Sequence, residues 1–236
     1  MQGFDAHIGK DGFRLRGIAF SRIDAFSDVV FGFALTLLVV SLEVPHTFEE
    51  LNHSLRGFIP FAICFFLLIL LWYSHFKFFR RYGLHDNGTI VLNAVLLFVV
   101  LFYVYPLKFL FTVLTNAWVG QDNSAFGSSG QMRELMTLYG LGFVAVYLLF
   151  TALHWNAWRQ RKELQLTPVE LFLTRSAMVE YSSMAGVGLV SILVALLAPR
   201  NYVGVAGLIY TSLWIVGMMH GRWESRRLKQ LEKLHS

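Results

Sequence analysis

Two acidic side chains open an otherwise apolar stretch of this sequence, and acids in such surroundings need polar partners. Asp24 follows Ser21 by three residues, which is the spacing of a capping box at a helix start. Asp28 lies deeper, and no charged residue follows it until Glu43. A carboxylate removed from water is costly unless cations or hydrogen-bond donors surround it. Because Arg22 does not share a helix face with Asp28, we expect the partners of Asp28 on neighbouring helices.

Few other residues in the apolar stretches offer chemistry. Glu180 is the other acid deep in such a stretch, and a locally paired or snorkelling charge explains it more simply than a transport role. The single cysteine, Cys64, excludes an internal disulfide and is expected to be a small buried hydrophobe. Three histidines fall near the ends of apolar stretches, and no two of them have metal-site spacing within one helix: His75, His154 and His220. We expect neither a metal nor an enzyme's set of convergent catalytic groups.

The composition predicts a membrane protein. Of the 236 residues, 56% are hydrophobic and only 15% are charged, whereas soluble domains carry about 25% charged residues. The apolar residues form blocks of about 20, which is long enough to cross roughly 30 Å of hydrocarbon. The net charge of +5 is spread over the ends of these blocks, so nucleic acid is not an expected partner. The polar first 20 residues lack the apolar core of a signal peptide.

Six apolar segments predict an all-α membrane protein with six transmembrane helices per subunit. Their approximate limits are residues 22–44, 55–79, 89–114, 135–158, 172–197 and 203–223, with a loop over 116–131. We divide the chain into a cytoplasmic N-terminal segment (1–20), a six-helix transmembrane domain (21–223) and a basic C-terminal segment (224–236). The last segment fits an amphipathic helix, on the membrane surface or between subunits, and fits a solvated tail equally well.

Lysine and arginine are concentrated on one side of the predicted membrane domain. Fifteen of them lie at the two termini and in the second-to-third and fourth-to-fifth loops, against four on the opposite side. Cytoplasmic loops carry the excess of basic residues. We therefore expect a multi-pass protein of the cell membrane with both termini in the cytoplasm.

The first segment also carries a recognisable motif. Arg22-x-x-x-Phe26-Ser27-Asp28, followed by an apolar run over residues 29–38, resembles the signature first helix of the transmembrane-protein-175 potassium channels. The resemblance extends to Pro106 through a series of spaced residues: Trp72, His75, Asp86 and Asn93. It implies a homotetramer in which the first helices line a central pore. It also implies that potassium is the permeant ion and that no cofactor is required.

The resemblance further implies roles for individual residues. The motif residues brace the pore helix through hydrogen bonds and do not bind the ion: Arg22, Phe26, Ser27, Asp28, Trp72, His75 and Asn93. Further along, Phe33 is expected at the constriction, Thr36 at a selectivity-determining threonine, and Leu37 and Val40 at further layers of the pore. These four share one helix face by their spacing, and rings of apolar side chains exclude ions by dewetting. The family usually has leucine or isoleucine where this chain has Phe33, and four phenyl rings would fill the axis more completely.

We therefore expect a potassium-permeable cation channel in the lipid bilayer with a hydrophobic constriction. The alternative is a proton-coupled secondary transporter that uses the intramembrane acids Asp28 and Glu180. Transporters usually consist of two related halves, and the first three segments show no convincing similarity to the last three.

Overall fold

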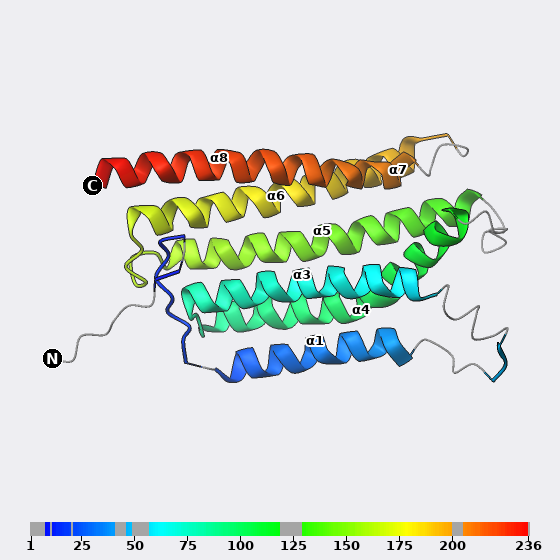
Figure 1. Ribbon diagram of the computed structural model, residues 1–236, viewed down its shortest axis with the longest axis horizontal. Coiled ribbons are helices and arrows are strands. Elements are labelled where there is room, and N and C mark those ends of the chain that lie inside the picture. Colours follow the sequence, from blue (N-terminus) through cyan, green and yellow to red (C-terminus); the bar gives the residue numbers. More distant parts are fainter. Residues whose placement is uncertain are drawn as a thin grey trace.

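The computed structural model describes residues 8–9, 11–19, 21–40, 46–48, 57–118, 129–199 and 205–235. Within these ranges the regular structure is helical, apart from a single bridge between Ile8 and Arg14. The long helices run up and down side by side, so that α1 begins and α8 ends at the same end of the bundle (Figure 1). The helices are α1 (Arg22–Val40), α3 (Phe58–Tyr82), α4 (Asn87–Trp118), α5 (Ser129–Arg159), α6 (Pro168–Leu197), α7 (Val205–Leu208), the 3-10 turn η2 (Ile209–Thr211) and α8 (Ser212–His235).

Five of these helices are long and apolar enough to cross a membrane: α1, α3, α4, α5 and α6. The end of the first predicted segment, the start of the second and most of the 116–131 loop lie outside the described residues. The helices extend beyond several predicted limits because their polar ends were not counted as apolar. The clearest case is α6, which begins at Pro168 through a capping box in which Thr167 and Glu170 satisfy each other's backbone amides.

The sixth predicted segment is not one continuous helix within the described residues. Its start lies outside the described residues, and the rest is divided among α7, η2 and the first half of α8. α8 then continues without a break through the predicted limit at residue 223 to His235. Its second half is rich in lysine and arginine, so α8 is largely apolar in its first half and strongly basic in its second.

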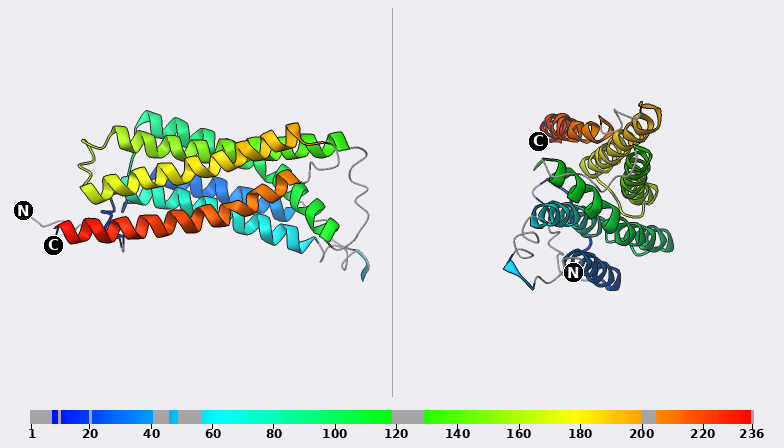
Figure 2. Two further views of the ribbon diagram at one scale, coloured as in Figure 1. Left: turned by 90° about the horizontal axis from the view of Figure 1, so that it is seen from above. Right: turned by 90° about the vertical axis from the view of Figure 1, so that its right-hand side faces the viewer.

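The helices pack in a row from one edge of the subunit to the other. α1 packs mainly against α3 and α4, α4 packs against α5, α5 against α6, and α6 against α8. The end-on view places α1 and α8 at opposite edges (Figure 2). α4 and α5 approach so closely that a Cβ atom on Gly142 would lie 2.2 Å from the Tyr103 ring. The helix at the start of the row, α1, therefore has neighbours on one side only.

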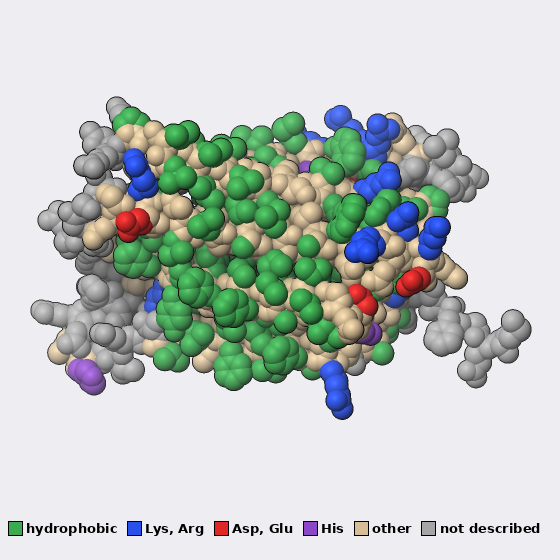
Figure 3. Space-filling model, turned by 180° about the vertical axis from the view of Figure 1, so that it is seen from behind, with side chains coloured by type: hydrophobic (Ala, Val, Ile, Leu, Met, Phe, Trp, Pro, Cys, Tyr) green, Lys and Arg blue, Asp and Glu red, His purple; other side chains and the backbone are tan. Residues whose placement is uncertain are grey.

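The surface has the charge distribution of a membrane protein. Hydrophobic side chains cover the middle of the face shown in Figure 3, and lysine and arginine side chains gather mainly toward one end. Large apolar side chains are exposed on several helices, including Phe66, Phe98 and Leu197 at 67%, 69% and 81%. This agrees with a belt that faces hydrocarbon rather than water.

A segment before α1, residues 11–17, crosses the basic end of the bundle; we call it the strap. Phe13 of the strap is fully buried, with its ring edge-on to Tyr82 at 5.3 Å and the Arg81 guanidinium 4.9 Å from its centre. Asp11 forms an ion pair with Arg81. Burial raises the pKa of this carboxyl, but the Arg81 charge and hydrogen bonds outweigh burial and the net pKa is lowered.

Two further contacts attach the strap to α6 and α3. Arg14 and Arg16 both donate to the carboxylate of Glu170, whose side chain is fully buried, at 2.9–3.2 Å. Gly17 donates its amide to the Arg80 carbonyl at 3.1 Å, and a Cβ atom there would lie 2.2 Å from the Phe79 carbonyl oxygen. The strap thus holds the chain against the bundle five residues before α1 begins.

Candidate pore-lining helix and its polar anchor

α1 begins with the capping box that the sequence predicts. The Ser21 hydroxyl donates to Oδ2 of Asp24 at 2.7 Å, and the Asp24 amide donates to the Ser21 hydroxyl at 3.2 Å. The other carboxylate oxygen of Asp24 is buried and has no hydrogen-bond partner within the described residues. It adjoins a cavity of about 70 Å³ that Asp24, Asp28, His75 and Arg80 help to line. That space holds about two water molecules.

One face of α1 is buried against α3 and α4. Its buried residues recur every three or four positions: Ser27, Val30, Phe31, Ala34 and Leu38. Ser27 is the polar member of this face, and its hydroxyl donates to the Ile23 carbonyl at 2.7 Å. The remaining four positions contribute apolar contacts, so the face changes from polar to apolar along the helix.

Three buried polar side chains connect α1, α4 and α3. Nδ2 of Asn93 donates to the Ser27 hydroxyl at 2.9 Å, and Oδ1 of Asn93 lies 2.7 Å from Nε2 of His75. Because Oδ1 of an amide only accepts, Nε2 of His75 carries the proton in this arrangement. The exposed fractions of the three residues are 0–3%. We call Ser27, Asn93 and His75 the buried triad.

Asp28 has its own partner next to the buried triad. The indole Nε1–H of Trp72, on α3, donates to Oδ1 of Asp28 at 2.8 Å. The partner therefore lies on a neighbouring helix, as the sequence predicts. A hydrogen bond to a charged acceptor is stronger than one between neutral groups, so this pair adds a second polar link between α1 and α3.

Two motif residues lie outside these links within the subunit. Arg22 is exposed at the start of α1 and makes no side-chain hydrogen bond or ion pair in the part of the chain that the structure describes. Phe26 is 61% exposed on the face opposite Ser27. The single subunit thus connects five of the seven motif residues, in two groups, and leaves Arg22 and Phe26 on its surface.

The opposite face of α1 is uncovered. Phe33 and Val40 are 62% and 73% exposed, Thr36 is exposed, and Leu37 is half-buried at the edge of this face. Five exposed residues follow one line along the helix, with the exposed Gly32 and Val39 beside it: Phe26, Val29, Phe33, Thr36 and Val40. We call this line the uncovered stripe. It is apolar except for Thr36, whose hydroxyl donates to the Gly32 carbonyl at 2.9 Å.

At the start of α4, Asp86 accepts hydrogen bonds from three other residues. Its carboxylate accepts from the amide and hydroxyl of Thr89, from Asn156 and from Gln160, at 2.6–3.2 Å. Burial raises the pKa of Asp86, but these hydrogen bonds outweigh it and hold the pKa below its usual value of 3.8. The cluster fixes the start of α4 against the end of α5, six residues before Asn93.

The sequence did not reveal the role of Glu170. Thr167-Pro168-x-Glu170 was a visible helix-start signal, but the arginine partners of Glu170 lie 154 and 156 residues earlier. The structure also separates the two acids of the transporter alternative. Asp28 adjoins the cavity beside α1, whereas Glu180 lines another cavity between α3 and α6.

The chain is similar in sequence to one family model and to several proteins named as potassium channels. The family described as "Endosomal/lysosomal potassium channel TMEM175" matches residues 22–103. A protein named "Potassium channel" from Marivirga tractuosa is 40% identical over 241 aligned residues, which cover 97% of each chain. A potassium channel from Chamaesiphon minutus is 30% identical over 56% of this chain and 63% of its own length.

Two crystal structures are similar in fold. A variant of the potassium channel MtTMEM175, solved with a nanobody fusion, is 39% identical with a TM-score of 0.83, over 93% of this chain and 99% of that one. A lysosomal potassium-selective channel homologue from Chamaesiphon minutus has a TM-score of 0.58 at 22% identity, over 84% of this chain and 96% of that one. The second likeness concerns the fold alone.

Proposed function

Because this chain belongs to the TMEM175 family of potassium channels, which are not enzymes, we propose that α1 lines its potassium path. The protein is an all-helical, multi-pass membrane protein. In our proposal four subunits surround one axis, each α1 turns its uncovered stripe toward that axis, and the α7–η2–α8 segment makes the sixth membrane crossing. The basic end, where both α1 begins and α8 ends, faces the cytoplasm of a cell-membrane protein.

The uncovered stripe carries this proposal. A helix at the edge of its subunit exposes two phenylalanines and two valines in line, and an apolar line of this kind needs cover by lipid or by another subunit. Four copies facing one axis would cover one another and would stack their side chains in rings. The other face of α1 is occupied by α3 and α4, so the side of α1 that carries the stripe is the side free to face a pore.

The rings would control ion passage by hydration. A narrow ring of Phe33 side chains expels water and leaves a potassium ion without ligands, which makes this ring the constriction. One turn further, Thr36 offers an oxygen. Its hydroxyl proton is engaged with the Gly32 carbonyl, so the oxygen lone pairs remain free to replace part of the ion's hydration shell. Leu37 and Val40 would form the next apolar layers.

The motif residues would hold the stripe at the axis. The buried triad and the Trp72–Asp28 pair fix the rotation of α1 about its own axis, because each engages the face opposite the stripe. Arg22 and Phe26 are exposed in the single subunit and would meet neighbouring subunits in the tetramer. None of these residues needs to contact the ion.

A flux measurement tests the constriction. In potassium-loaded liposomes, Phe33→Ala is expected to raise the flux at least ~tenfold, which corresponds to a barrier lower by about 1.4 kcal/mol. Phe66→Ala is the matched control, since Phe66 is equally exposed on α3 but lies off the stripe. An unchanged flux in Phe33→Ala, or an equal rise in Phe66→Ala, would contradict the assignment.

Cross-linking tests the arrangement of the four subunits. In a Cys64→Ser background, Val40→Cys is expected to form inter-subunit disulfides under mild oxidation, because four copies of the stripe meet at the axis. Leu38→Cys, buried within the subunit at 1% exposure, is the control that should not cross-link. A monomer by native mass spectrometry, or equal cross-linking of both variants, would refute the tetrameric pore.

A further inference from the structure

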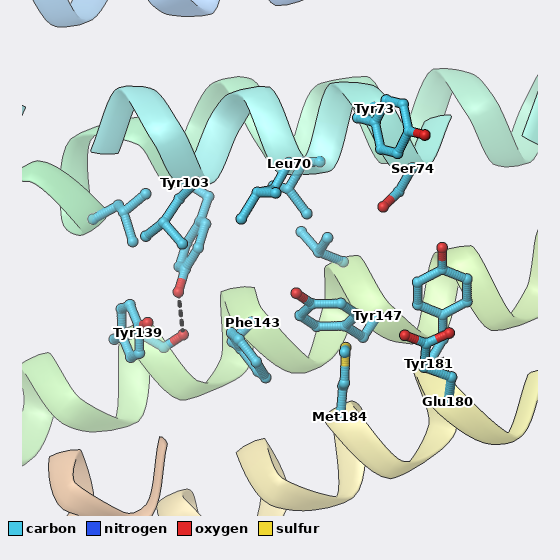
Figure 4. A pocket seen from close by; sticks show the side chains of 14 residues that line it. Leu70, Tyr73, Ser74, Tyr103, Tyr139, Phe143, Tyr147, Glu180, Tyr181 and Met184 are labelled. Atoms are coloured by element: carbon cyan, nitrogen blue, oxygen red, sulfur yellow. Dashed lines mark hydrogen bonds between the residues drawn. The ribbon is translucent and has the colours of Figure 1, made fainter. Parts of the chain in front are cut away.

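A cavity of about 240 Å³ lies between α3, α4, α5 and α6, and no residue of α1 lines it (Figure 4). The space equals the share of about eight water molecules, which suits a small organic molecule. Most of its wall consists of leucine and aromatic side chains. Five tyrosines from four helices line it: Tyr73, Tyr103, Tyr139, Tyr147 and Tyr181. The only acid is Glu180.

Glu180 lies deep in the membrane-spanning part of α6. It follows the start of the helix by about twelve residues, or roughly 18 Å. Within the described residues its carboxylate makes no ion pair and no side-chain hydrogen bond. An ionisable side chain at such depth is costly and usually marks a functional site.

The charged groups around Glu180 do not neutralise it by contact. From α3, Lys77 and Arg81 face it at longer range, and from α8 so do His220 and Glu224. Arg81 is already paired with Asp11. His220 and Glu224 pair with each other and bind Ser176, and Lys77 extends to the exposed surface.

The cavity is graded from charged to apolar. Tyr181 stands beside Glu180 at one end, and Tyr147 lies across the middle (Figure 4). Their rings are stacked with centres 6.2 Å apart, and Phe143 continues the aromatic wall 4.6 Å from Tyr147. At the other end the Tyr103 hydroxyl is satisfied by the Tyr139 carbonyl at 3.0 Å. The wall at that end is therefore made mainly of rings and hydrocarbon.

We propose that this cavity binds a small organic ammonium ion, with its charged head between Glu180 and the tyrosine rings and its apolar body toward Phe143. Tyrosine faces attract cations, and quaternary ammonium groups are recognised by such aromatic walls. The carboxylate supplies the opposite charge, and the leucine-lined end excludes a bare metal ion, which would require several oxygen ligands. Because α1 takes no part, the proposal stands independently of the ion path.

The test uses the full-length protein in lipid nanodiscs and benzyltrimethylammonium as the probe. Saturable binding to the wild type is expected by equilibrium dialysis. Glu180→Gln, which preserves shape, should raise Kd at least ~tenfold, and Tyr147→Leu about threefold or more, whereas Tyr147→Phe should stay within about twofold because the ring face remains.

Controls separate this site from others. Glu163→Gln removes an exposed acid from the α5–α6 connection and should leave Kd unchanged. Thermal unfolding of each variant identifies any loss of folding. Tyr147→Leu and Tyr147→Phe both remove the hydroxyl, and only Tyr147→Phe keeps the aromatic ring. Absence of saturable binding to the wild type, as when lipid fills the cavity, would overturn the proposal. Equal Kd values for wild type and Glu180→Gln would overturn it as well.

Discussion

The two halves of α1 are held in different ways. The half that begins at Arg22 carries a capping box, a member of the buried triad and the Asp28–Trp72 hydrogen bond. The half that ends at Val40 contacts α3 and α4 mainly through the apolar side chains of Phe31, Ala34 and Leu38. Directional hydrogen bonds fix the first half, and non-directional apolar packing supports the second.

The difference suggests why one helix can be both anchored and responsive. Buried hydrogen bonds have defined partners, so the first half cannot rotate without breaking them. Apolar contacts tolerate small shifts at low cost, and the exposed side chains of the uncovered stripe add little contact within the subunit. In the proposed pore, the second half could therefore change the width of the pore while the first half keeps α1 in register.

The largest expected effect comes from removing the centre of the buried triad. Asn93→Leu removes the donor to the Ser27 hydroxyl, which keeps its hydrogen bond to the Ile23 carbonyl, and it leaves His75 Nε2 without its acceptor in an apolar environment. Each loss costs about 1–3 kcal/mol, so the sum is about 3 kcal/mol, or a Tm lower by roughly 6–12 °C for a chain of this size. Differential scanning fluorimetry in detergent measures the shift.

Two controls make this test specific to the anchored half. Asn87→Leu changes the same residue type at an exposed position of α4 and should be nearly neutral. Val40→Ala changes the unanchored half at a site that is 73% exposed within the subunit and should also leave monomer stability nearly unchanged. If Asn93→Leu were as mild as these two, the two halves of α1 would not differ in the way described.

The second largest expected effect comes from loosening the strap, which precedes the anchored half of α1 in the chain. Glu170→Gln removes the charge that Arg14 and Arg16 share, and the side chain of Glu170 is fully buried. Breaking a buried ion pair costs 3–5 kcal/mol, and the partial exposure of the arginines reduces this to about 2 kcal/mol. Thermal unfolding at low and high salt measures the loss, with Glu163→Gln as the exposed control.

Limited proteolysis of Glu170→Gln measures directly how firmly the strap is held. Limited proteolysis is expected to cut Glu170→Gln within residues 11–17 faster than wild type, because the strap loses its contact with α6. Cleavage rates that match those of wild type would show that Phe13, the Asp11–Arg81 pair and the Gly17–Arg80 hydrogen bond hold the strap without the Glu170 charge.

Much of this arrangement was predictable because it depends on short spacings. The three-residue interval from Ser21 to Asp24 specifies the capping box, and the isolation of Asp28 in an apolar stretch implies a partner on another helix. The lengths of the apolar blocks predicted five helices directly. In the sixth segment the lysines and arginines after residue 221 lower the mean hydropathy, so the sequence did not show that one helix runs on through them to His235.

The remainder depends on contacts that no local pattern encodes. The arginine partners of Glu170 are separated from it by more than 150 residues, and the five tyrosines that line one cavity with Glu180 come from four helices. The exposure of Arg22 also required the structure, because the motif predicts that Arg22 belongs to a network but not that its side chain is exposed in the single subunit.

The smallest expected effect concerns Asp86, which positions the start of α4 and hence Asn93. Its folded pKa is below the usual 3.8, so its contribution to stability is complete above the unfolded pKa and is lost as pH falls below about 4. Asp86→Asn should cost about 1 kcal/mol at pH 7, and its Tm should converge on that of wild type as the pH is lowered from 5 to 3. A Tm difference that stays constant over this range would mean that the Asp86 charge does not fix α4. The register of the buried triad would then depend on Asn93 and its own packing alone.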